Sequence, residues 1–335
     1  MAVIRTKSYS IMIANDAFIN IKEHLKGFDG KVFYLLVDAR VLSLYDKTIT
    51  NAFRDLDYTI VSIPEGESSK SFSTLENTIQ QLIDKQIKRN DVIIALGGGV
   101  VGDLAGLVAA LLFRGIDYIQ IPTTLLSMVD SSIGGKTAIN ISQGKNLVGA
   151  FYMPKKVIID PVFLKTLEEA EYLSGLSEIL KAGLIHDAEL LHQVKTQKFV
   201  DETMIERAIN VKLDYVKKDP FDKNIRHILN FGHTFGHAIE KYYDYKIPHG
   251  EAVAQGIIKA LELGVKLSLT PQKLLEEVTE VIKEKALVRH PIPDSKELYP
   301  YLSQDKKSTH DGIRFILLED YQKPSIQRLS WEVFR

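Results

Sequence analysis

Four short runs of apolar residues in the first half of the chain constrain its fold more than any other feature. They occupy residues 32–37, 58–63, 91–96 and 118–121 and stop at Asp38, Pro64, Gly97 and Pro122. Strands that are apolar throughout belong to sheets covered on both faces. Between the second and third runs, Leu75, Ile79 and Leu82 recur at helical spacing. This alternation of strand and helix predicts a parallel, doubly wound sheet.

After Pro161 the sequence changes to helical patterns. We predict helices at residues 168–186, 201–218, 228–243, 251–267 and 271–285, and a strand only at 313–318. A chain of 335 residues is long enough for two domains. We therefore expect an α/β, Rossmann-like N-terminal domain over residues 1–157 and a mainly α-helical C-terminal domain over residues 158–335.

Composition excludes several classes of protein. The 42 basic and 43 acidic residues balance, so charge does not favour nucleic acid or an anionic membrane as a partner. The chain has no cysteine, so a metal would be held by His, Asp or Glu. The N-terminus lacks the apolar segment of a signal peptide, and the longest apolar run, 104–113, is too short to span a bilayer. We expect a soluble, cytoplasmic enzyme.

A glycine-rich loop, residues 97–103, follows the third apolar run and precedes a helical pattern. Its glycines would let the backbone approach a pyrophosphate, and the helix N-terminus would supply N–H donors. The spacing differs from GxGxxG, and the loop follows the third strand rather than the first, so a tight turn is the alternative. The loop indicates a nucleotide site only together with other residues.

Polar residues also follow the first and second apolar runs. Asp38 is placed to accept a ribose hydroxyl, although aspartate at the end of a strand also forms turns. Glu67 and Lys70 offer an acid and a base near the same ribose, or belong to a solvated loop.

The segment 230–240, Asn-Phe-Gly-His-Thr-Phe-Gly-His-Ala-Ile-Glu, carries His233 and His237, which would share one face of a helix. Such a pair binds metal or forms hydrogen-bonded core histidines. His249 follows soon after, and Glu178 lies in an otherwise apolar helical segment, where a carboxylate needs a cation or hydrogen bonds. Two imidazoles and a carboxylate suit Zn²⁺ and leave positions open for substrate oxygens. A metal here would make the chain an enzyme with its active site between the two expected domains.

Several cations lie in apolar or glycine-rich contexts: Lys136, Lys145, Lys212 and Arg226. Residues 132–137 do not form a Walker A motif, because the first glycine is missing at the required offset. A single lysine is usually solvated. The number of cations beside the other motifs therefore indicates an anionic ligand.

Taken together, these motifs resemble the 3-dehydroquinate synthase family over nearly the whole chain. The matching segments are 97–106, 113–115, 120–126, 130–137, 144–146, 178–181, 230–237 and 249–251. The resemblance implies a dehydroquinate synthase-like fold, NAD, and one divalent metal per subunit, Zn²⁺ or alternatively Co²⁺. It implies 3-deoxy-D-arabino-heptulosonate 7-phosphate as the substrate and 3-dehydroquinate and phosphate as products. It also implies a homodimer, in which Arg114 reaches the phosphate in the neighbouring subunit.

The resemblance further implies a role for each matching residue. The metal ligands would be Glu178, His233 and His249. NAD would contact Asp38, Glu67, Lys70, Gly97, Gly98, Gly99, Asp103, Thr123 and Thr124, with Asp130, Lys145, Phe163 and Thr166 around the nicotinamide and its ribose. The phosphate would be bound by Lys136, which also lies beside the cofactor, and by Asn146, His237 and either Lys306 or Lys307. The substrate carboxylate would be bound by Lys212 and Arg226, and its hydroxyls by Lys181 and Asn230.

The implied reaction oxidises a substrate hydroxyl with NAD, eliminates phosphate, returns the hydride, opens the ring and closes a carbocycle by an aldol step. One alternative is another sugar-phosphate cyclase, such as 2-deoxy-scyllo-inosose synthase, whose substrate has no carboxylate for Lys212 and Arg226. Others are a metal-dependent polyol dehydrogenase of the glycerol dehydrogenase type, which would release NADH, and a binding module without activity. Arg40 departs from the family pattern and could admit a 2′-phosphate, which leaves the choice between NAD and NADP open.

Overall fold

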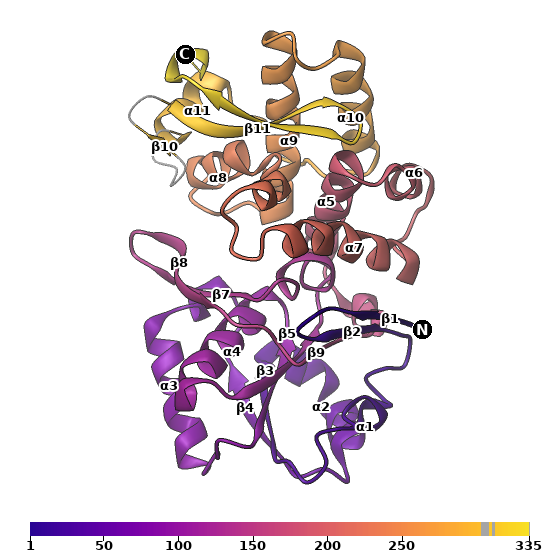
Figure 1. The fold of residues 1–335 in the computed structure, drawn as a ribbon, viewed down its shortest axis with the longest axis vertical. Helices are drawn as coiled ribbons and strands as arrows, with labels where there is room; N and C mark the ends of the chain where they lie inside the picture. The colour runs from indigo at the N-terminus through magenta and orange to yellow at the C-terminus, as the bar shows by residue number, and fades with distance from the viewer. Residues whose placement is uncertain (303–307, 310–311, 335) are drawn as a thin grey trace. The chain divides into compact units, whose positions relative to one another are not determined.

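The structure is a computed structural model that describes residues 1–302, 308–309 and 312–334 (Figure 1). Its contacts divide the chain into two compact units, Met1–Leu167 and Glu168–Arg335. The expected domain boundary, between residues 157 and 158, lies within β9 (Lys156–Ile159). This strand pairs with β2 (Ser10–Ile13) and β6 (Asp117–Pro122), so it belongs to the sheet of the first unit.

A seven-stranded sheet forms the centre of the first unit, in the order β1-β2-β9-β6-β5-β3-β4. The strands not yet named are β1 (Ala2–Arg5), β3 (Phe33–Asp38), β4 (Tyr58–Ile63) and β5 (Val92–Gly97). Only the β1–β2 pair is antiparallel among the pairings of this sheet in the described residues. The four apolar runs are β3, β4, β5 and β6, which confirms the predicted parallel α/β sheet.

Helices cover this sheet on both faces, as Figure 1 shows. They are α1 (Ile21–His24), α2 (Ala39–Phe53), α3 (Phe72–Asp84) and α4 (Gly99–Leu111). From β3, Tyr34 and Leu36 join a core cluster with Leu75 of α3 and Leu104 of α4. The alternate residue Leu35 points to the opposite face and is fully buried as well. Burial on both faces explains why the strands are apolar throughout.

An antiparallel hairpin, β7 (Lys136–Ile141) and β8 (Gly144–Phe151), also belongs to the first unit and was not predicted. In β7 only Thr137 and Ile139 are buried, β8 has no buried residue, and lysines and glycines interrupt the apolar positions of both strands. The hairpin therefore lacks the continuous apolar pattern that identified the central strands.

The second unit is mainly helical, as predicted. Its helices are α5 (Glu169–Ile185), α6 (Ala188–Thr196), α7 (Glu202–Lys218), α8 (His233–Tyr242), α9 (His249–Lys266), α10 (Gln272–Glu284) and α11 (Ser295–Leu302). A small antiparallel sheet contains β10 (Ser308–Thr309), β11 (Gly312–Asp320) and β12 (Lys323–Leu329). Helix α9 is buried along most of its length and packs against α5, α8, α10 and β11. Within the described ranges, no helix combines the length and apolarity that crossing a membrane requires.

Helix α8 begins later than predicted. The prediction placed its start at residue 228, but residues Ile225–Asn230 form a 3-10 helix and Gly232 has a left-handed backbone, with φ of 78°. A left-handed residue cannot continue an α-helix, so α8 starts at His233. The shift moves His233 from the middle of a helix to its first position.

Candidate active site

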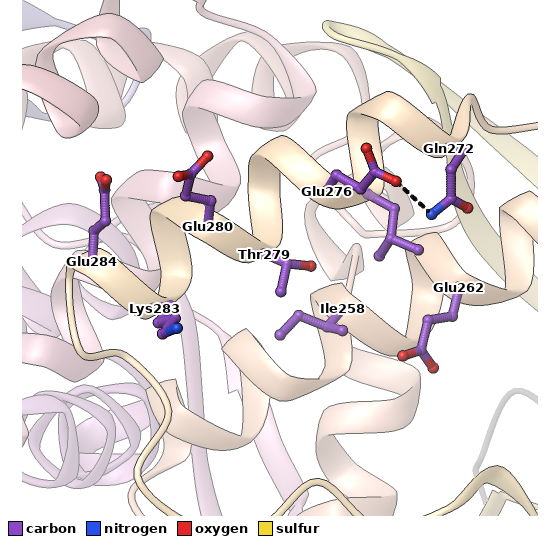
Figure 2. A pocket seen from close by; sticks show the side chains of 9 residues that line it. Ile258, Glu262, Gln272, Glu276, Thr279, Glu280, Lys283 and Glu284 are labelled. Atoms are coloured by element: carbon purple, nitrogen blue, oxygen red, sulfur yellow. Dashed lines mark hydrogen bonds between the residues drawn. The ribbon is translucent and has the colours of Figure 1, made fainter.

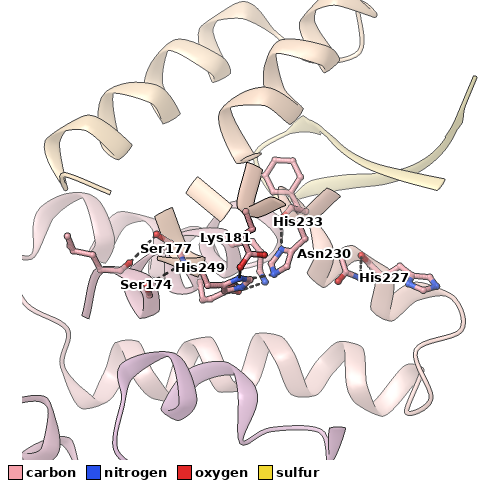
Figure 3. Close-up of polar contacts among 12 residues, drawn as sticks. Ser174, Ser177, Lys181, His227, Asn230, His233 and His249 are labelled. Carbon is pink, nitrogen blue, oxygen red and sulfur yellow. Dashed lines mark hydrogen bonds and ion pairs between the residues drawn. The ribbon is translucent and has the colours of Figure 1, made fainter. Parts of the chain in front are cut away.

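Three side chains from three helices converge in the second unit. The Oε1 atom of Glu178, on α5, lies 3.4 Å from Nε2 of His233 and 3.9 Å from Nε2 of His249. One potential ligand atom from each residue lies within 4.8 Å of the others. These are the three residues predicted to hold the metal, and Figure 3 shows His233 and His249 side by side.

Close helix packing brings the three ligands together. His233 and His249 are the first residues of α8 and α9. A Cβ atom on Gly256 of α9 would lie 2.1 Å from the carbonyl oxygen of Gly232, and one on Gly250 would lie 2.2 Å from Cα of Ser174 on α5. Only glycine allows helix backbones to approach this closely. The glycines therefore set the spacing of the ligands.

Hydrogen bonds fix which imidazole nitrogens face the carboxylate. Nδ1 of His233 lies 3.2 Å from the carbonyl oxygen of Phe231, which can only accept, so Nδ1 carries the proton. Burial, and then the charges of Lys181 and the two neighbouring histidines, hold the pKa of His233 well below its ordinary value. The ring is therefore neutral, and its Nε2 lone pair points at the Glu178 carboxylate.

The second ligand histidine is oriented in the same way. Nδ1 of His249 lies 3.4 Å from Oε1 of Glu240, a buried carboxylate near the end of α8. With Nδ1 protonated toward Glu240, Nε2 of His249 is the nitrogen that would bind a metal. Sequence reasoning did not assign Glu240 a role. Its position one helical repeat after His233, on the same face of α8, was the available signal.

The donor set fits a divalent metal. Oε1 of Glu178 is buried and has no hydrogen-bond partner among the described residues, while its other oxygen pairs with Lys181. One possible ligand atom from each of Glu178, His233 and His249 thus lies within 4.8 Å of the others, close enough to bind one cation. Such an arrangement is repulsive unless a cation lies there, and two imidazoles with a carboxylate suit Zn²⁺.

His237 lies beside this cluster. Its ring centroid is 5.6 Å from that of His233 and 6.4 Å from that of His249. It is not part of the group whose ligand atoms converge. The geometry is compatible with the predicted division, in which His237 faces the substrate phosphate rather than the metal.

The predicted carboxylate ligands are buried cations of the same unit. Lys212 on α7 is 9% exposed and Arg226 is 2% exposed. The guanidinium of Arg226 donates to the carbonyl oxygen of Pro220 at 2.8 Å. Asn230 donates to the carbonyl oxygen of His227 at 3.2 Å (Figure 3). Lys306 and Lys307 lie outside the described residues.

The glycine loop of the first unit lies where a parallel sheet binds ligands. Gly97 ends β5 and Gly98 caps the N-terminus of α4. The strand order reverses between β3 and β5, so their carboxyl ends flank a topological switch point. A Cβ atom on Gly97 would lie 3.1 Å from Cβ of Asp38, so the two predicted NAD contacts are neighbours.

The other predicted ribose and pyrophosphate contacts gather at the same edge. Asp38 caps α2 by accepting the backbone N–H of Arg40 at 2.9 Å. Lys70 is buried and donates to Asp103 at 2.7 Å, while Glu67 lies 3.8 Å from the same ammonium group. These carboxylates and donors suit a dinucleotide with ribose hydroxyls.

The remaining predicted cofactor contacts differ in their surroundings. Thr123 follows β6, and its N–H donates to the carbonyl oxygen of Gly97 at 3.0 Å, while a Cβ atom on Gly98 would lie 3.0 Å from the Thr124 side chain. Phe163 is 2% exposed, and its ring packs edge-on against Phe18 and Tyr45. Its ring is therefore covered by protein. Thr166 bonds to the Tyr45 hydroxyl at 2.7 Å. Asp130 lies in a π-helix, Ser127–Ser131, whereas Lys136 is the first residue of β7 and Lys145 lies in β8.

A separate cavity of about 780 Å³ lies between α9 and α10 (Figure 2). It is lined by Ile258, Thr279, Lys283 and four glutamates, Glu262, Glu276, Glu280 and Glu284, together with Gln272 and Leu275. None of the predicted site residues is among those that line it. The candidate metal centre of the second unit, at the convergence of α5, α8 and α9, and the candidate nucleotide site of the first unit, at the glycine loop, are both distinct from this cavity.

Comparison with known proteins confirms the family that the sequence motifs resemble. Residues 60–174 match the family described as 3-dehydroquinate synthase N-terminal, and residues 175–308 match the family described as 3-dehydroquinate synthase C-terminal. The chain is 37% identical to a 3-dehydroquinate synthase of Clostridium botulinum (strain Alaska E43 / Type E3), over 99% of this chain and 98% of the relative.

Two solved structures have the same fold. One is a 2-epi-5-epi-valiolone synthase from Streptomyces hygroscopicus subsp. jinggangensis 5008 with NAD⁺ and Zn²⁺ bound, with a TM-score of 0.89 and 26% identity over 100% of this chain and 96% of that one. The other is a 2-deoxy-scyllo-inosose synthase complexed with carbaglucose-6-phosphate, NAD⁺ and Co²⁺. It has a TM-score of 0.87 and 26% identity over 98% of this chain and 96% of that one.

Proposed function

Because the chain belongs to the 3-dehydroquinate synthase family, we propose that it converts 3-deoxy-D-arabino-heptulosonate 7-phosphate to 3-dehydroquinate and phosphate. One observation supports this above all others. Possible ligand atoms of Glu178, His233 and His249 lie within 4.8 Å of one another, in a chain whose other half carries a glycine loop at a topological switch point. An enzyme that needs both a metal and a dinucleotide accounts for the two features together.

The residues that would hold each group are distinct. Glu178, His233 and His249 would bind the metal, and the residues around Asp38 and the glycine loop would bind NAD. When bound, NAD supplies an acceptor that takes up and returns a hydride within one turnover, and the metal supplies a Lewis acid. The protein contributes binding, orientation and electrostatic stabilisation.

Lys181 would position a substrate hydroxyl. Its ammonium group is buried and pairs with the Glu178 oxygen that does not face the histidines. This ion pair holds a proton donor next to the metal ligand. Asn230 would bind another hydroxyl through its amide. Together they would fix which carbon of the sugar is presented for oxidation.

Lys212 and Arg226 would bind the substrate carboxylate. Both are buried cations, and the planar fork of a guanidinium matches a carboxylate. This pair favours the dehydroquinate reaction over the 2-deoxy-scyllo-inosose reaction, whose substrate has no carboxylate.

Lys136, Asn146 and His237 would bind the phosphate and stabilise it as it leaves. Preorganised cations and hydrogen-bond donors lower the energy of a departing dianion without a strong base. The substrate phosphate itself can take the proton from the neighbouring carbon. No additional general base is then required for the elimination.

Arg114 would complete the phosphate site of a neighbouring subunit in a homodimer. Phe113 and Arg114 both have left-handed backbones, with φ of 51° and 63°, just before Gly115. Non-glycine residues in this region are strained, and such strain often occurs at functional positions. The Arg114 side chain is exposed in the single chain, as a residue that reaches a partner must be.

A turnover assay tests the function. We expect the purified chain with Zn²⁺ to release phosphate from 3-deoxy-D-arabino-heptulosonate 7-phosphate with catalytic NAD and no net NADH. Accumulation of NADH in proportion to product would instead indicate a polyol dehydrogenase. Turnover of glucose 6-phosphate in place of the heptulosonate would indicate an inosose synthase.

A further inference from the structure

The β7–β8 hairpin contains an irregularity at Asn140. Ile139 pairs with Val148, but the next pair is Ile141 with Gly144, so the single residue Asn140 of β7 lies opposite three residues of β8, 145–147. The extra residues of this bulge, which include Asn146, belong to β8, and a bulge re-aims the residues that it contains. The backbone N–H of Asn140 donates to the carbonyl oxygen of Lys70 at 2.7 Å instead of to β8. The bulge thus ties the hairpin to the loop after β4.

The Asn140 side chain makes two further hydrogen bonds. Its Nδ2 donates to Oε1 of Glu67 at 2.7 Å, and its Oδ1 accepts the backbone N–H of Asn146 at 2.8 Å. A carboxylate can only accept and a backbone N–H can only donate, so the orientation of the amide is fixed. Asn140 therefore links Glu67, a predicted NAD contact, to Asn146, a predicted phosphate contact.

A second link joins the same two groups. The ammonium of Lys70, which is 5% exposed, donates to Oδ1 of Asn146 at 2.5 Å and to Asp103 at 2.7 Å. Asn146 has a left-handed backbone with φ of 55°, and its N–H and its side chain are both held by this network. Lys70 and Asn140 thus clamp Asn146 from two sides. Each of them also contacts a residue expected at the cofactor.

We propose that Asn140 is a positioning residue that couples NAD binding to phosphate binding within the first unit. This inference rests on the proposed function, because that function assigns the two ligands. Glu67 and Lys70 would be fixed by the ribose of NAD, and through Asn140 and Lys70 they would fix Asn146 for the phosphate. A phosphate that arrives after NAD would then meet an ordered ligand. Such coupling is reciprocal and commonly changes affinity by about 5- to 150-fold.

The coupling can be measured with inorganic phosphate as the probe. Calorimetric titration of the zinc-loaded, full-length protein gives phosphate affinity without NAD and with saturating NAD. We expect NAD to raise phosphate affinity by about tenfold in the wild type. In Asn140→Asp the acceptor for Asn146 is kept, but the donor to Glu67 is replaced by a second carboxylate. The NAD-dependent gain should then fall to near onefold.

Two further variants separate coupling from simple hairpin stability. Gln143→Ala, at the exposed tip of the same hairpin, should keep the full gain. The double variant Glu67→Gln, Asn140→Asp can form the contact with donor and acceptor exchanged. It should regain part of the coupling even though Glu67→Gln alone weakens NAD binding.

Three results would overturn the proposal. They are an unchanged gain in Asn140→Asp, the absence of any gain in the wild type, and an equal loss in Asn140→Asp and Gln143→Ala. A wild type that turns over the heptulosonate phosphate without this coupling would reject the role of Asn140 and keep the proposed function. A wild type that shows the coupling without turnover would reject the proposed substrate and keep the role of Asn140.

Discussion

The Oε1 atom of Glu178 and Nε2 of His233 face each other at 3.4 Å with no proton between them. The Nδ1–H group of His233 donates a hydrogen bond to the Phe231 carbonyl oxygen, and the lowered pKa of His233 keeps the ring neutral. Oε1 of Glu178 has no hydrogen-bond partner in the described part of the chain. An unsatisfied buried carboxylate oxygen costs about 1–3 kcal/mol or more, and a bound metal would remove this cost. The relationship leads directly to the first two predictions.

Glu178→Gln should abolish tight zinc binding. The glutamine amide is nearly the same shape as the carboxylate but supplies no charge and one weaker ligand atom. Zinc affinity should fall by more than the roughly 10- to 100-fold that loss of an outer-shell partner costs. Zinc content after dialysis measures the loss. Glu189→Gln, an exposed substitution on α6, is the matched control. Full zinc content in Glu178→Gln would show that Glu178 is not a metal ligand.

Glu240→Gln should weaken zinc binding less severely. Glu240 contacts Nδ1 of His249 at 3.4 Å and is 4% exposed, so it orients the ligand without touching the metal. We expect zinc affinity to fall by about 10- to 100-fold, measured by competition with a chelator. Glu280→Gln on α10 makes the same chemical change at an exposed position and should have no effect. Equal affinities in the two variants would show that Glu240 does not orient His249.

The sequence predicted the central sheet well because its strands are buried on both faces and thus continuously apolar. It also singled out Glu178, His233 and His249, because histidines and a buried carboxylate are rare in apolar helical segments. The start of α8 was wrong because a single left-handed glycine, Gly232, overrides the apolar periodicity around it. Periodicity reports which face is buried, not where the backbone turns.

The roles of Asn140 and Glu240 were not predicted, for a different reason. Asn140 acts through a register shift in a hairpin, and register depends on pairing with a distant segment. Glu240 acts through an imidazole that belongs to another helix. In both cases the information lies in tertiary contacts, and a single sequence without those contacts gives only the residue type.

Asp219→Asn should lower stability at neutral pH and weaken substrate binding. The Asp219 carboxylate accepts backbone N–H groups of Lys223, Asn224 and Arg226, and these bonds, that of Lys223 first, hold its pKa below the usual value. A carboxylate whose pKa is lower in the folded state than in the unfolded state stabilises the fold. This stabilisation is fully present above the unfolded-state pKa of about 4 and is lost as pH falls through the folded-state pKa.

Thermal unfolding at several pH values tests this dependence. The wild type should unfold at a higher temperature than Asp219→Asn at pH 7, and the difference should shrink below about pH 4. The KM for the heptulosonate phosphate should also rise, because Asp219 fixes the segment that carries Arg226. Asp244→Asn, whose side chain is 83% exposed, is the control. A difference that stays constant with pH would show that the Asp219 charge is not responsible.

Glu65→Gln should increase the use of NADP⁺. Arg40, next to the predicted ribose ligand Asp38, lies 3.7 Å from the Glu65 carboxylate, and both side chains are partly exposed. Glu65 therefore neutralises the cation that would otherwise attract a 2′-phosphate. Removal of the charge should raise NADP⁺ affinity by about two- to fivefold, the size that an exposed ion pair allows. Arg40→Gln should show no such gain, and neither should the double variant. An equal gain in all three would exclude Arg40 as the group that binds the phosphate.

Gly256→Ala should disrupt the metal site without touching a ligand. The added Cβ atom would lie 2.1 Å from the Gly232 carbonyl oxygen and 2.6 Å from the Gly236 nitrogen, and these backbone atoms cannot rotate away. Helices α8 and α9 must then move apart, which separates His233 from its partners. We expect a loss of about 1–3 kcal/mol in the free energy of unfolding, together with a large loss of zinc affinity. Ala260→Gly, one turn further along α9, lowers stability by about 1 kcal/mol and adds no atom near His233. The Ala260→Gly control should retain its zinc affinity. If Gly256→Ala also retained its zinc affinity, the close approach of α8 and α9 would not set the metal geometry.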